Sequence, residues 1–139
     1  MRRPDTLRRP TGWAKLIVTA CAVVLFGAAG NAATVSELQS RALDGIPGKE
    51  GTMILVEYAP GDVDPIHRHD ASVFLYVLEG TIIMQVEGGK LVTLHPGETY
   101  FEGRNDVHIV GRNASQTKSA KFVAVLVKDQ GAPILMPVK

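Results

Sequence analysis

The stretch Gly61–Gly80, with the sequence GDVDPIHRHDASVFLYVLEG, contains the features on which the interpretation of the whole chain depends. It places His67 and His69 two residues apart and follows them with an apolar run that ends in Glu-Gly. Side chains at positions i and i+2 of an extended strand project to the same face. Two imidazoles would then face one point, and imidazole is the commonest metal ligand in proteins. Two exposed histidines on a surface strand give the same spacing, so the pair alone leaves both interpretations open.

Two sequence motifs resemble those of the cupin family, and the resemblance covers roughly residues 52–128. The first motif is carried by Gly61, His67, His69 and Tyr76–Gly80. The second is carried by Pro96-Gly97-Glu98, His108 and Asn113. In the second motif four residues separate the histidine from the asparagine, where the family usually has three. The family also has a glutamate ligand where this chain has Val73 or Phe74, so the usual fourth protein ligand is missing.

The resemblance implies an all-β double-stranded β-helix, a jelly-roll barrel, whose interior forms the site. It implies that His67, His69 and His108 meet there around a divalent metal ion, which could be iron, manganese, zinc, nickel or copper. Three neutral ligands leave coordination positions open, which is typical of a catalytic site. Glu102 is the best carboxylate to replace the missing glutamate, either as a ligand or as a general base. No catalytic residue is assigned beyond these.

The wall of the site is expected to be apolar and aromatic. Because side chains alternate along a strand, only one of Val73 and Phe74 faces inward, and the family alignment favours Val73. The candidate wall residues are Val73, Phe74, Tyr76, Met84 and Phe101. Other polar residues are interpreted more simply: Asp62 and Asp64 as solvated turn residues, and His95 as a surface residue.

From residue 52 onward the chain has many short strand-forming segments separated by Gly and Pro turns, which is typical of a sandwich or small barrel. Gly88-Gly89 indicates a two-residue hairpin turn, because both glycines accept the positive φ angles of a primed turn. Residues 33–50 are polar, and we expect a loop, a short helical turn or an arm that leads into the sheet. The expected strands are Thr52–Tyr58, Val73–Glu79, Thr81–Glu87, Lys90–Leu94, Thr99–Glu102, Val107–Val110 and Lys121–Lys128.

Residues 1–32 have the pattern of a secretory signal peptide: a basic start, an apolar stretch at Leu16–Gly30 and small residues at the end. At about 15 residues the apolar stretch is short for a membrane span, which needs about 20. We therefore expect a bacterial periplasmic or secreted protein with no stable membrane span after cleavage. An uncleaved N-terminal membrane anchor is the alternative.

Cleavage after residue 32 would remove Cys21, the single cysteine, and with it any disulfide or cysteine nucleophile. It would leave ten basic and 13 acidic residues, a formal net charge of −3, with no basic cluster of the kind that binds nucleic acid. The expected organisation is a signal peptide at 1–32, an N-terminal arm at 33–51, a barrel at 52–128 and a C-terminal tail at 129–139. The resemblance also implies that the arm pairs with a second subunit in a homodimer.

Two functions follow from this pattern. The first is a metal-dependent oxygenase, isomerase or lyase that acts on a small molecule. The second is a non-catalytic cupin module of the cell envelope that binds a ligand or dimerises. The fold alone does not choose between them, because one fold supports many chemistries.

Overall fold

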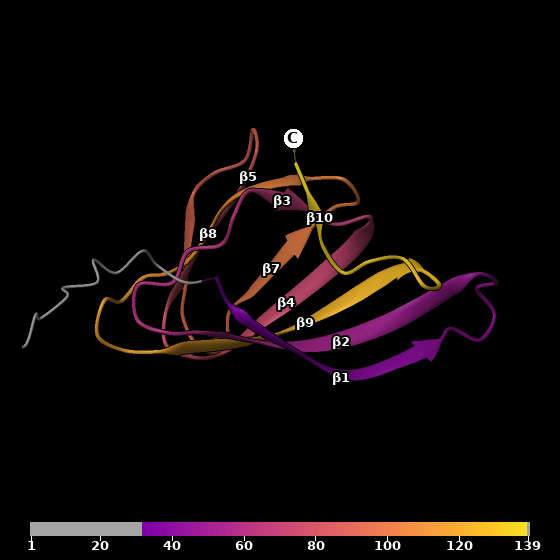
Figure 1. Cartoon of the computed structure of the whole chain (residues 1–139), viewed down its shortest axis with the longest axis horizontal. Coiled ribbons are helices and arrows are strands. Elements are labelled where there is room, and N and C mark those ends of the chain that lie inside the picture. The colour runs from indigo at the N-terminus through magenta and orange to yellow at the C-terminus, as the bar shows by residue number, and fades with distance from the viewer. Residues whose placement is uncertain (1–31, 139) are drawn as a thin grey trace, which may run out of the picture.

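The computed structural model describes residues 32–138, which form two five-stranded antiparallel sheets (Figure 1). The first sheet contains, in spatial order, β1 (Thr34–Ala42), β2 (Lys49–Tyr58), β9 (Ala120–Asp129), β4 (Ala71–Glu79) and β7 (Thr99–Glu102). The second contains β10 (Met136–Pro137), β3 (His67–Arg68), β8 (Val107–Asn113), β5 (Ile82–Val86) and β6 (Val92–Leu94). The chain passes from one sheet to the other between β2 and β3, and at most later connections. The predicted all-β architecture is confirmed for the described residues.

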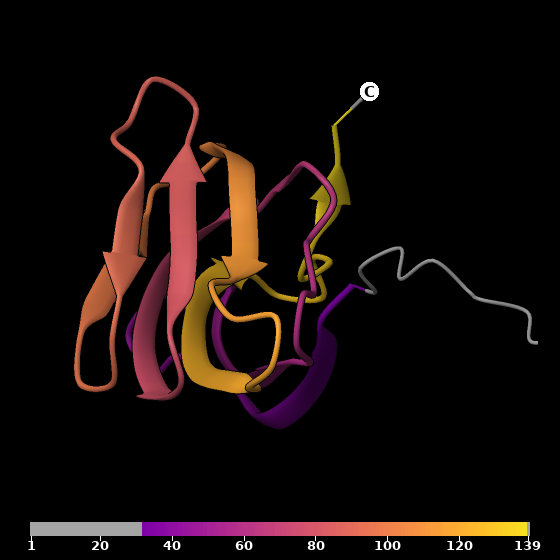
Figure 2. The same ribbon diagram turned by 90° about the vertical axis from the view of Figure 1, so that its left-hand side faces the viewer.

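The sheets curve around one apolar interior, and Figure 2 shows the curvature of β9 and β1. Strict alternation supplies this interior. On β4 the side chains of Ala71, Val73, Leu75 and Val77 are buried, while those between them are partly or largely exposed. On β9 the buried residues are Ala120, Phe122, Ala124, Leu126 and Lys128.

Gly80, which closes the first motif, ends β4 with a positive φ of 72°. A Cβ atom at this position would lie 2.5 Å from the Ser119 carbonyl oxygen and 2.7 Å from the Ala120 Cα atom. Only glycine meets both requirements, because other residues resist positive φ and a side chain would clash with this backbone. The close approach brings the end of β4 against the start of β9.

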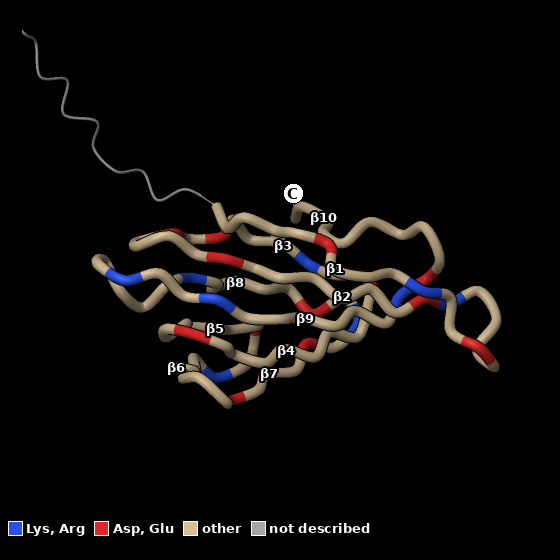
Figure 3. The backbone as a smooth tube through the Cα atoms, turned by 90° about the horizontal axis from the view of Figure 1, so that it is seen from below, with Lys and Arg blue, Asp and Glu red and all other residues tan. Residues whose placement is uncertain are grey.

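The charged residues of the first sheet lie mainly towards the ends of its strands (Figure 3), whereas an apolar row crosses its outer face. Strand register aligns Met53, Val125, Phe74 and Phe101 in one row across β2, β9, β4 and β7. At one end Lys121 pairs with Glu57 at 2.8 Å, and at the other Lys49 pairs with Asp129 at 2.5 Å. The two phenylalanine rings contact each other, with centroids 5.1 Å apart.

The segment before the barrel forms a strand, so the alternative of a short helical turn is wrong. β1 pairs along β2 with one register shift, between Glu37 and Gln39, and the Ser40 and Thr52 hydroxyls lie 2.9 Å apart. Most β1 side chains are exposed because it is an edge strand. Its sequence therefore lacks the apolar alternation by which the other strands could be predicted.

The predicted two-residue hairpin at Gly88-Gly89 is also wrong. Pairing between β5 and β6 ends at Met84 and Val92, which leaves a longer connection. The Gly89 amide donates to the Val86 carbonyl at 2.9 Å, and of the two glycines only Gly88 has a positive φ. The turn is thus centred on Glu87 and Gly88, and a primed turn with two positive φ angles is not formed.

The predicted signal peptide lies outside the described residues, apart from Ala32. Within residues 32–138 there is no helix with the length and apolar character that crossing a membrane requires. At the other end of the chain, β10 pairs with β3, so the tail is attached beside the first-motif histidines.

Candidate metal centre

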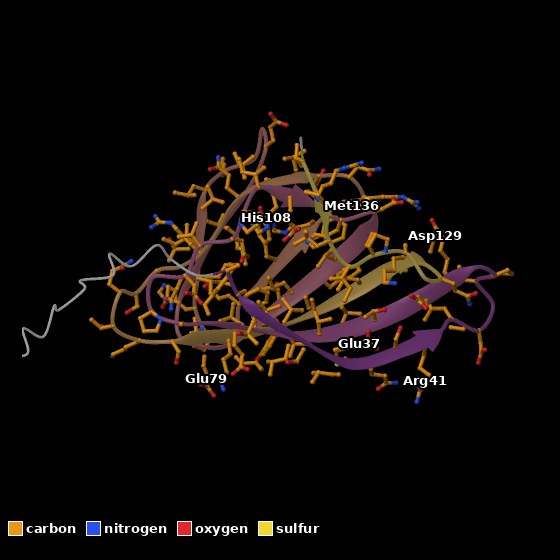
Figure 4. The ribbon with its side chains drawn as sticks, viewed as in Figure 1. Glu37, Arg41, Glu79, His108, Asp129 and Met136 are labelled. Carbon is orange, nitrogen blue, oxygen red and sulfur yellow. The ribbon has the colours of Figure 1, made fainter. Side chains whose placement is uncertain are left out.

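The structure brings the three predicted histidines together in the barrel interior. His67 lies on β3 and is paired in register with His108 on β8, while His69 follows β3 directly. The Nε2 atoms of His67 and His69 are 3.2 Å apart, and Nδ1 of His108 is 3.4 Å from Nε2 of His67. All three side chains are buried, and Figure 4 shows His108 between the two sheets.

Backbone carbonyls orient the first two imidazoles. Nδ1 of His67 lies 2.8 Å from the Pro65 carbonyl oxygen, and Nδ1 of His69 contacts the Ile134 carbonyl oxygen. Because a carbonyl oxygen only accepts, each Nδ1 must donate, and each neutral ring then carries its lone pair on Nε2. The two Nε2 lone pairs face each other across 3.2 Å. They repel unless a proton or a metal ion lies between them.

Glu102 contributes a carboxylate to the same point. Its side chain is buried, with Oε2 at 3.6 Å from Nε2 of His69 and Oε1 at 3.8 Å from Nδ1 of His108. Burial, with smaller contributions from Asp106 and Asp64, raises the pKa of Glu102 to about 7. A positive ion at this point would offset the cost of keeping such a carboxylate charged.

The chemistry of this donor set fits a divalent cation. Burial lowers the pKa of His69, and it lowers that of His108 to about 4, so both rings are neutral near pH 7. Glu102 Oε2 and His108 Nε2 are the buried side-chain atoms that lack a hydrogen-bond partner among the described residues. Within residues 32–138, however, no group of three or more His, Cys, Asp or Glu side chains is arranged so that it could hold a metal ion without rearrangement. The four side chains nevertheless lie close together, at separations of 3.2 to 3.8 Å, so small side-chain movements would suffice to bring them around one ion.

An apolar cavity of about 300 Å³ adjoins the four donors. Val73 and Met84 line it, as predicted. Phe74, Tyr76 and Phe101 do not, because they point outward and are about half exposed. The reason is strand alternation: Val73 and Glu102 face inward, so their neighbours Phe74 and Phe101 face outward. Sequence reasoning missed the wall residues Ile54, Val56, Leu75, Phe122, Ala124 and Leu126, which the same alternation would have found.

The family model described as a cupin domain matches residues 54–126, which is more than half of the 139-residue chain. The chain belongs to the cupin family. No relative among curated protein sequences matches it significantly.

Solved cupin structures share the fold. An uncharacterized conserved protein with a double-stranded β-helix domain from Klebsiella pneumoniae superimposes with a TM-score of 0.61 at 16% identity, covering 81% of this chain and 90% of that one. An oxalate oxidase superimposes with a TM-score of 0.59 at 26% sequence identity, and the match covers 78% of this chain and 56% of that one. The DMSP lyase DddQ from Ruegeria pomeroyi superimposes with a TM-score of 0.57 at 19% sequence identity, and the match covers 63% of this chain and 43% of that one. This cupin therefore spans about half the length of those two enzymes or less.

Glu102 lies next to the position at which this cupin departs from the motif. Glu102 on β7 is the direct cross-strand partner of Val73 on β4. Opposite residues of an antiparallel pair share one face, with Cβ atoms about 5 Å apart. A buried carboxylate thus lies on the adjacent strand, directly opposite position 73.

Of the two aspartates predicted to be solvated turn residues, Asp62 is buried, contrary to prediction, and Asp64 is half-buried. Asp62 is buried and accepts a hydrogen bond from the Ala59 amide at 2.7 Å. Asp64 accepts a hydrogen bond from the Tyr58 hydroxyl and also lines the cavity. His95 is exposed, as predicted.

Asn113 of the second motif has a structural role in this cupin. Its side chain is buried, and Nδ2 donates to the carbonyls of Ala59 at 2.9 Å and Lys118 at 2.8 Å. Its Oδ1 accepts the Ser115 amide at 2.9 Å. The residue therefore ties three loop segments together at the end of β8, away from direct contact with the histidines.

Proposed function

We propose that this cupin is a metal-dependent enzyme, an oxygenase, isomerase or lyase, that acts on a small molecule bound in its interior cavity. His67, His69, His108 and Glu102 would hold the divalent ion. The observation that carries this proposal is the opposed pair of Nε2 lone pairs, 3.2 Å apart and backed by two carbonyls. When bound, the ion would supply Lewis acidity for a substrate group. Iron, manganese, zinc, nickel and copper all suit this nitrogen-rich set.

The protein's own residues have separate tasks in this proposal. The carbonyls of Pro65 and Ile134 hold the first two imidazoles in their ligating tautomer, and such partners raise ligand basicity. The apolar wall excludes water and strengthens electrostatic interactions at the centre. Asp64 also lines the cavity, but both of its oxygens already accept hydrogen bonds, one from the Tyr58 hydroxyl and the other from the Ala33 amide at 3.3 Å, so it is assigned no catalytic role.

The likeness to an oxalate oxidase at 26% identity supports a small-molecule substrate. The alternative is a cupin that binds a ligand without turnover, for which the largely apolar cavity is the favouring observation. In that case removal of the metal would leave ligand affinity nearly unchanged.

The deciding experiment is elemental analysis of protein purified without a histidine tag. Wild type should carry near-stoichiometric metal, and the double variant H67A/H69A should lose it. His95→Ala is the matched control, because His95 is an exposed histidine outside the cluster, and it should retain wild-type metal content. A wild-type protein that neither contains metal nor takes up added Fe²⁺, Mn²⁺, Zn²⁺, Ni²⁺ or Cu²⁺ would contradict the proposal.

We also propose that a second copy of the chain covers the outer face of the first sheet, forming a symmetric homodimer. Phe74, Tyr76 and Phe101 are each about half exposed there and add about 100 Å² of apolar surface apiece. With the neighbouring valines and Met53 this patch would form the apolar centre of an interface, and the polar residues around it would supply the rest of the roughly 800 Å² per partner that a standard interface buries. Its neutral middle lets two copies meet without like-charge repulsion. Light scattering should give a dimer mass for wild type and a monomer mass for Phe74→Lys, with the exposed Leu91→Lys as control.

For localisation, we propose that residues 1–32 direct this cupin to the periplasm or outside the cell and are then removed. The supporting observation is their basic, apolar and small-residue pattern. The test is the N-terminal sequence of protein recovered from the periplasm and medium of an expressing bacterium. An intact N-terminus in the membrane fraction would instead support the anchor.

A further inference from the structure

The polar groups of the cavity belong to very few residue types. Five of its lining residues are polar or ionisable, namely His67, His69, His108, Glu102 and Asp64. The first four form the candidate metal centre, and Asp64 is held by the Tyr58 hydroxyl. Among the described lining residues there is no Lys, Arg, Ser, Thr, Asn or Gln. Beyond the centre, the cavity therefore offers a ligand apolar contacts only.

Cations near the interior are already engaged elsewhere. Lys128 is the inward-facing residue of β9 that follows Leu126, and its ammonium donates to Glu50 and, at 2.7 Å, to the Ala132 carbonyl. Arg104 pairs with Asp70 at 2.5 Å and Asp129 at 2.9 Å on the surface. Neither side chain lines the cavity, so neither is placed to neutralise an anionic group inside it.

The cavity opens between the start of β1 and the C-terminal tail. Val35 and Leu135 both line it while remaining 50% and 43% exposed, so they form its rim. The tail is held there because the Ile134 carbonyl accepts from His69. These two apolar side chains therefore lie where the cavity meets solvent.

We infer that the ligand is a small molecule with a single polar or anionic head, directed at the metal centre, and an uncharged apolar remainder that fills the cavity. The inference of a polar or anionic head depends on the proposed function, whereas the inference of an apolar remainder depends only on the lining of the cavity. A dicarboxylate too long to place both carboxylates at the metal centre is excluded, because its second charge would be buried in the cavity without a partner. Ligand sites of this kind take their specificity from a few polar groups set in an apolar wall.

The test compares hexanoate with adipate, which has the same chain length and a second carboxylate. Calorimetry on the metal-loaded full chain should give at least tenfold tighter binding for hexanoate. Methyl resonances of Ile54 and Leu126, which line the cavity, should shift with hexanoate and identify where it binds. Adipate binding as tight as hexanoate, or shifts confined to residues outside the cavity, would overturn the inference.

A neutral probe separates this inference from the metal proposal. Hexan-1-ol should shift the same methyl resonances in chelator-treated protein, with an affinity within about threefold of the metal-loaded form. If the protein holds no metal and hexan-1-ol still binds, the proposed function fails while the apolar cavity stands. If hexan-1-ol does not bind either form, the inference fails, whatever the metal content.

A lysine placed at the opening of the cavity would supply the positive charge that the cavity lacks. Leu135→Lys changes a partly exposed lining residue, so the fold should tolerate it, and it should raise adipate affinity at least fivefold. Leu91→Lys adds the same charge at an exposed residue outside the cavity and should leave adipate affinity within twofold. Equal adipate affinity in the two variants would show that the absence of a cation is not what excludes a second charge.

Discussion

Replacing Glu102 with leucine should change metal affinity and metal-free stability in opposite directions. In the metal-free protein Glu102 is a buried carboxyl group whose Oε2 lacks a hydrogen-bond partner. An unsatisfied buried polar group costs about 1–3 kcal/mol, and leucine removes that cost at similar volume. We therefore expect Glu102→Leu to raise the unfolding free energy of the metal-free protein by about 1–2 kcal/mol. For a domain of this size that is a rise in Tm of at least about 4 °C.

Metal affinity should fall in the same variant. Loss of a partner that only orients a ligand typically costs 10–100-fold in metal affinity, so loss of a ligating carboxylate should cost at least about 100-fold. That corresponds to about 2.7 kcal/mol of binding free energy. Competition with a chromophoric chelator gives the metal affinity, and scanning calorimetry of chelated samples gives the Tm. Glu87→Leu, at an exposed glutamate, is the control and should alter stability by less than about 0.5 kcal/mol.

The expected metal affinity and the expected metal-free stability can each be contradicted separately. If Glu102→Leu binds metal as tightly as wild type, the carboxylate is not a ligand. If the metal-free variant is less stable than wild type by more than 1 kcal/mol, the carboxyl group stabilises the fold and its burial is not an uncompensated cost. The double variant V73E/E102V moves the carboxylate to the family position and should recover most of the lost affinity.

Three further predictions concern the fold. Gly80→Ala should lower the unfolding free energy in urea by about 3 kcal/mol, because it combines a positive φ with a clash against the Ser119 carbonyl; a loss below 1 kcal/mol would contradict the tight approach. Asn113→Ala should cost about 1–3 kcal/mol by leaving loop carbonyls unpaired, and Asn113→Asp should not restore it. The hydrogen bond from Lys128 lowers the pKa of Glu50 below its ordinary 4.5 in the folded protein. The ionised Glu50 side chain therefore stabilises the folded state fully above pH 4.5, and this contribution is lost as the pH falls through the folded-state pKa. In urea titrations from pH 6 to pH 3, the unfolding free energy should fall less steeply with decreasing pH for Glu50→Gln than for wild type.

The parts of the structure that could be predicted follow from the alternation of inward-facing and outward-facing side chains along each strand. It places His67 and His69 on one face and turns Val73 inward, and both are observed. The same rule, applied from Glu102, would also have excluded Phe101 from the cavity wall. The phenylalanine was assigned inward because it is apolar, although apolar residues often remain on the surface.

What the sequence did not predict depends on register and on neighbours far along the chain. β1 is a polar edge strand whose pairing with β2 leaves no periodic signal. The burial of Asp62 depends on its contact with the Ala59 amide within a folded turn, which composition does not reveal. The carbonyl partner of His69 is 65 residues away, in a tail that has no motif of its own.

The Val73–Glu102 pair explains why the motif suggested three ligands where the barrel interior presents four donors. A motif records positions along the chain, whereas a ligand position is defined by a place on a sheet face. Opposite residues of an antiparallel pair share that face at a separation of about 5 Å, and a glutamate side chain is long enough to span most of that difference. A carboxylate can therefore move from β4 to β7 and still reach the same histidines, as the 3.6 Å and 3.8 Å contacts of Glu102 show. In this chain the cross-strand partner of Val73 is therefore the candidate replacement for the missing glutamate, and the metal affinity of V73E/E102V tests whether the two positions are interchangeable.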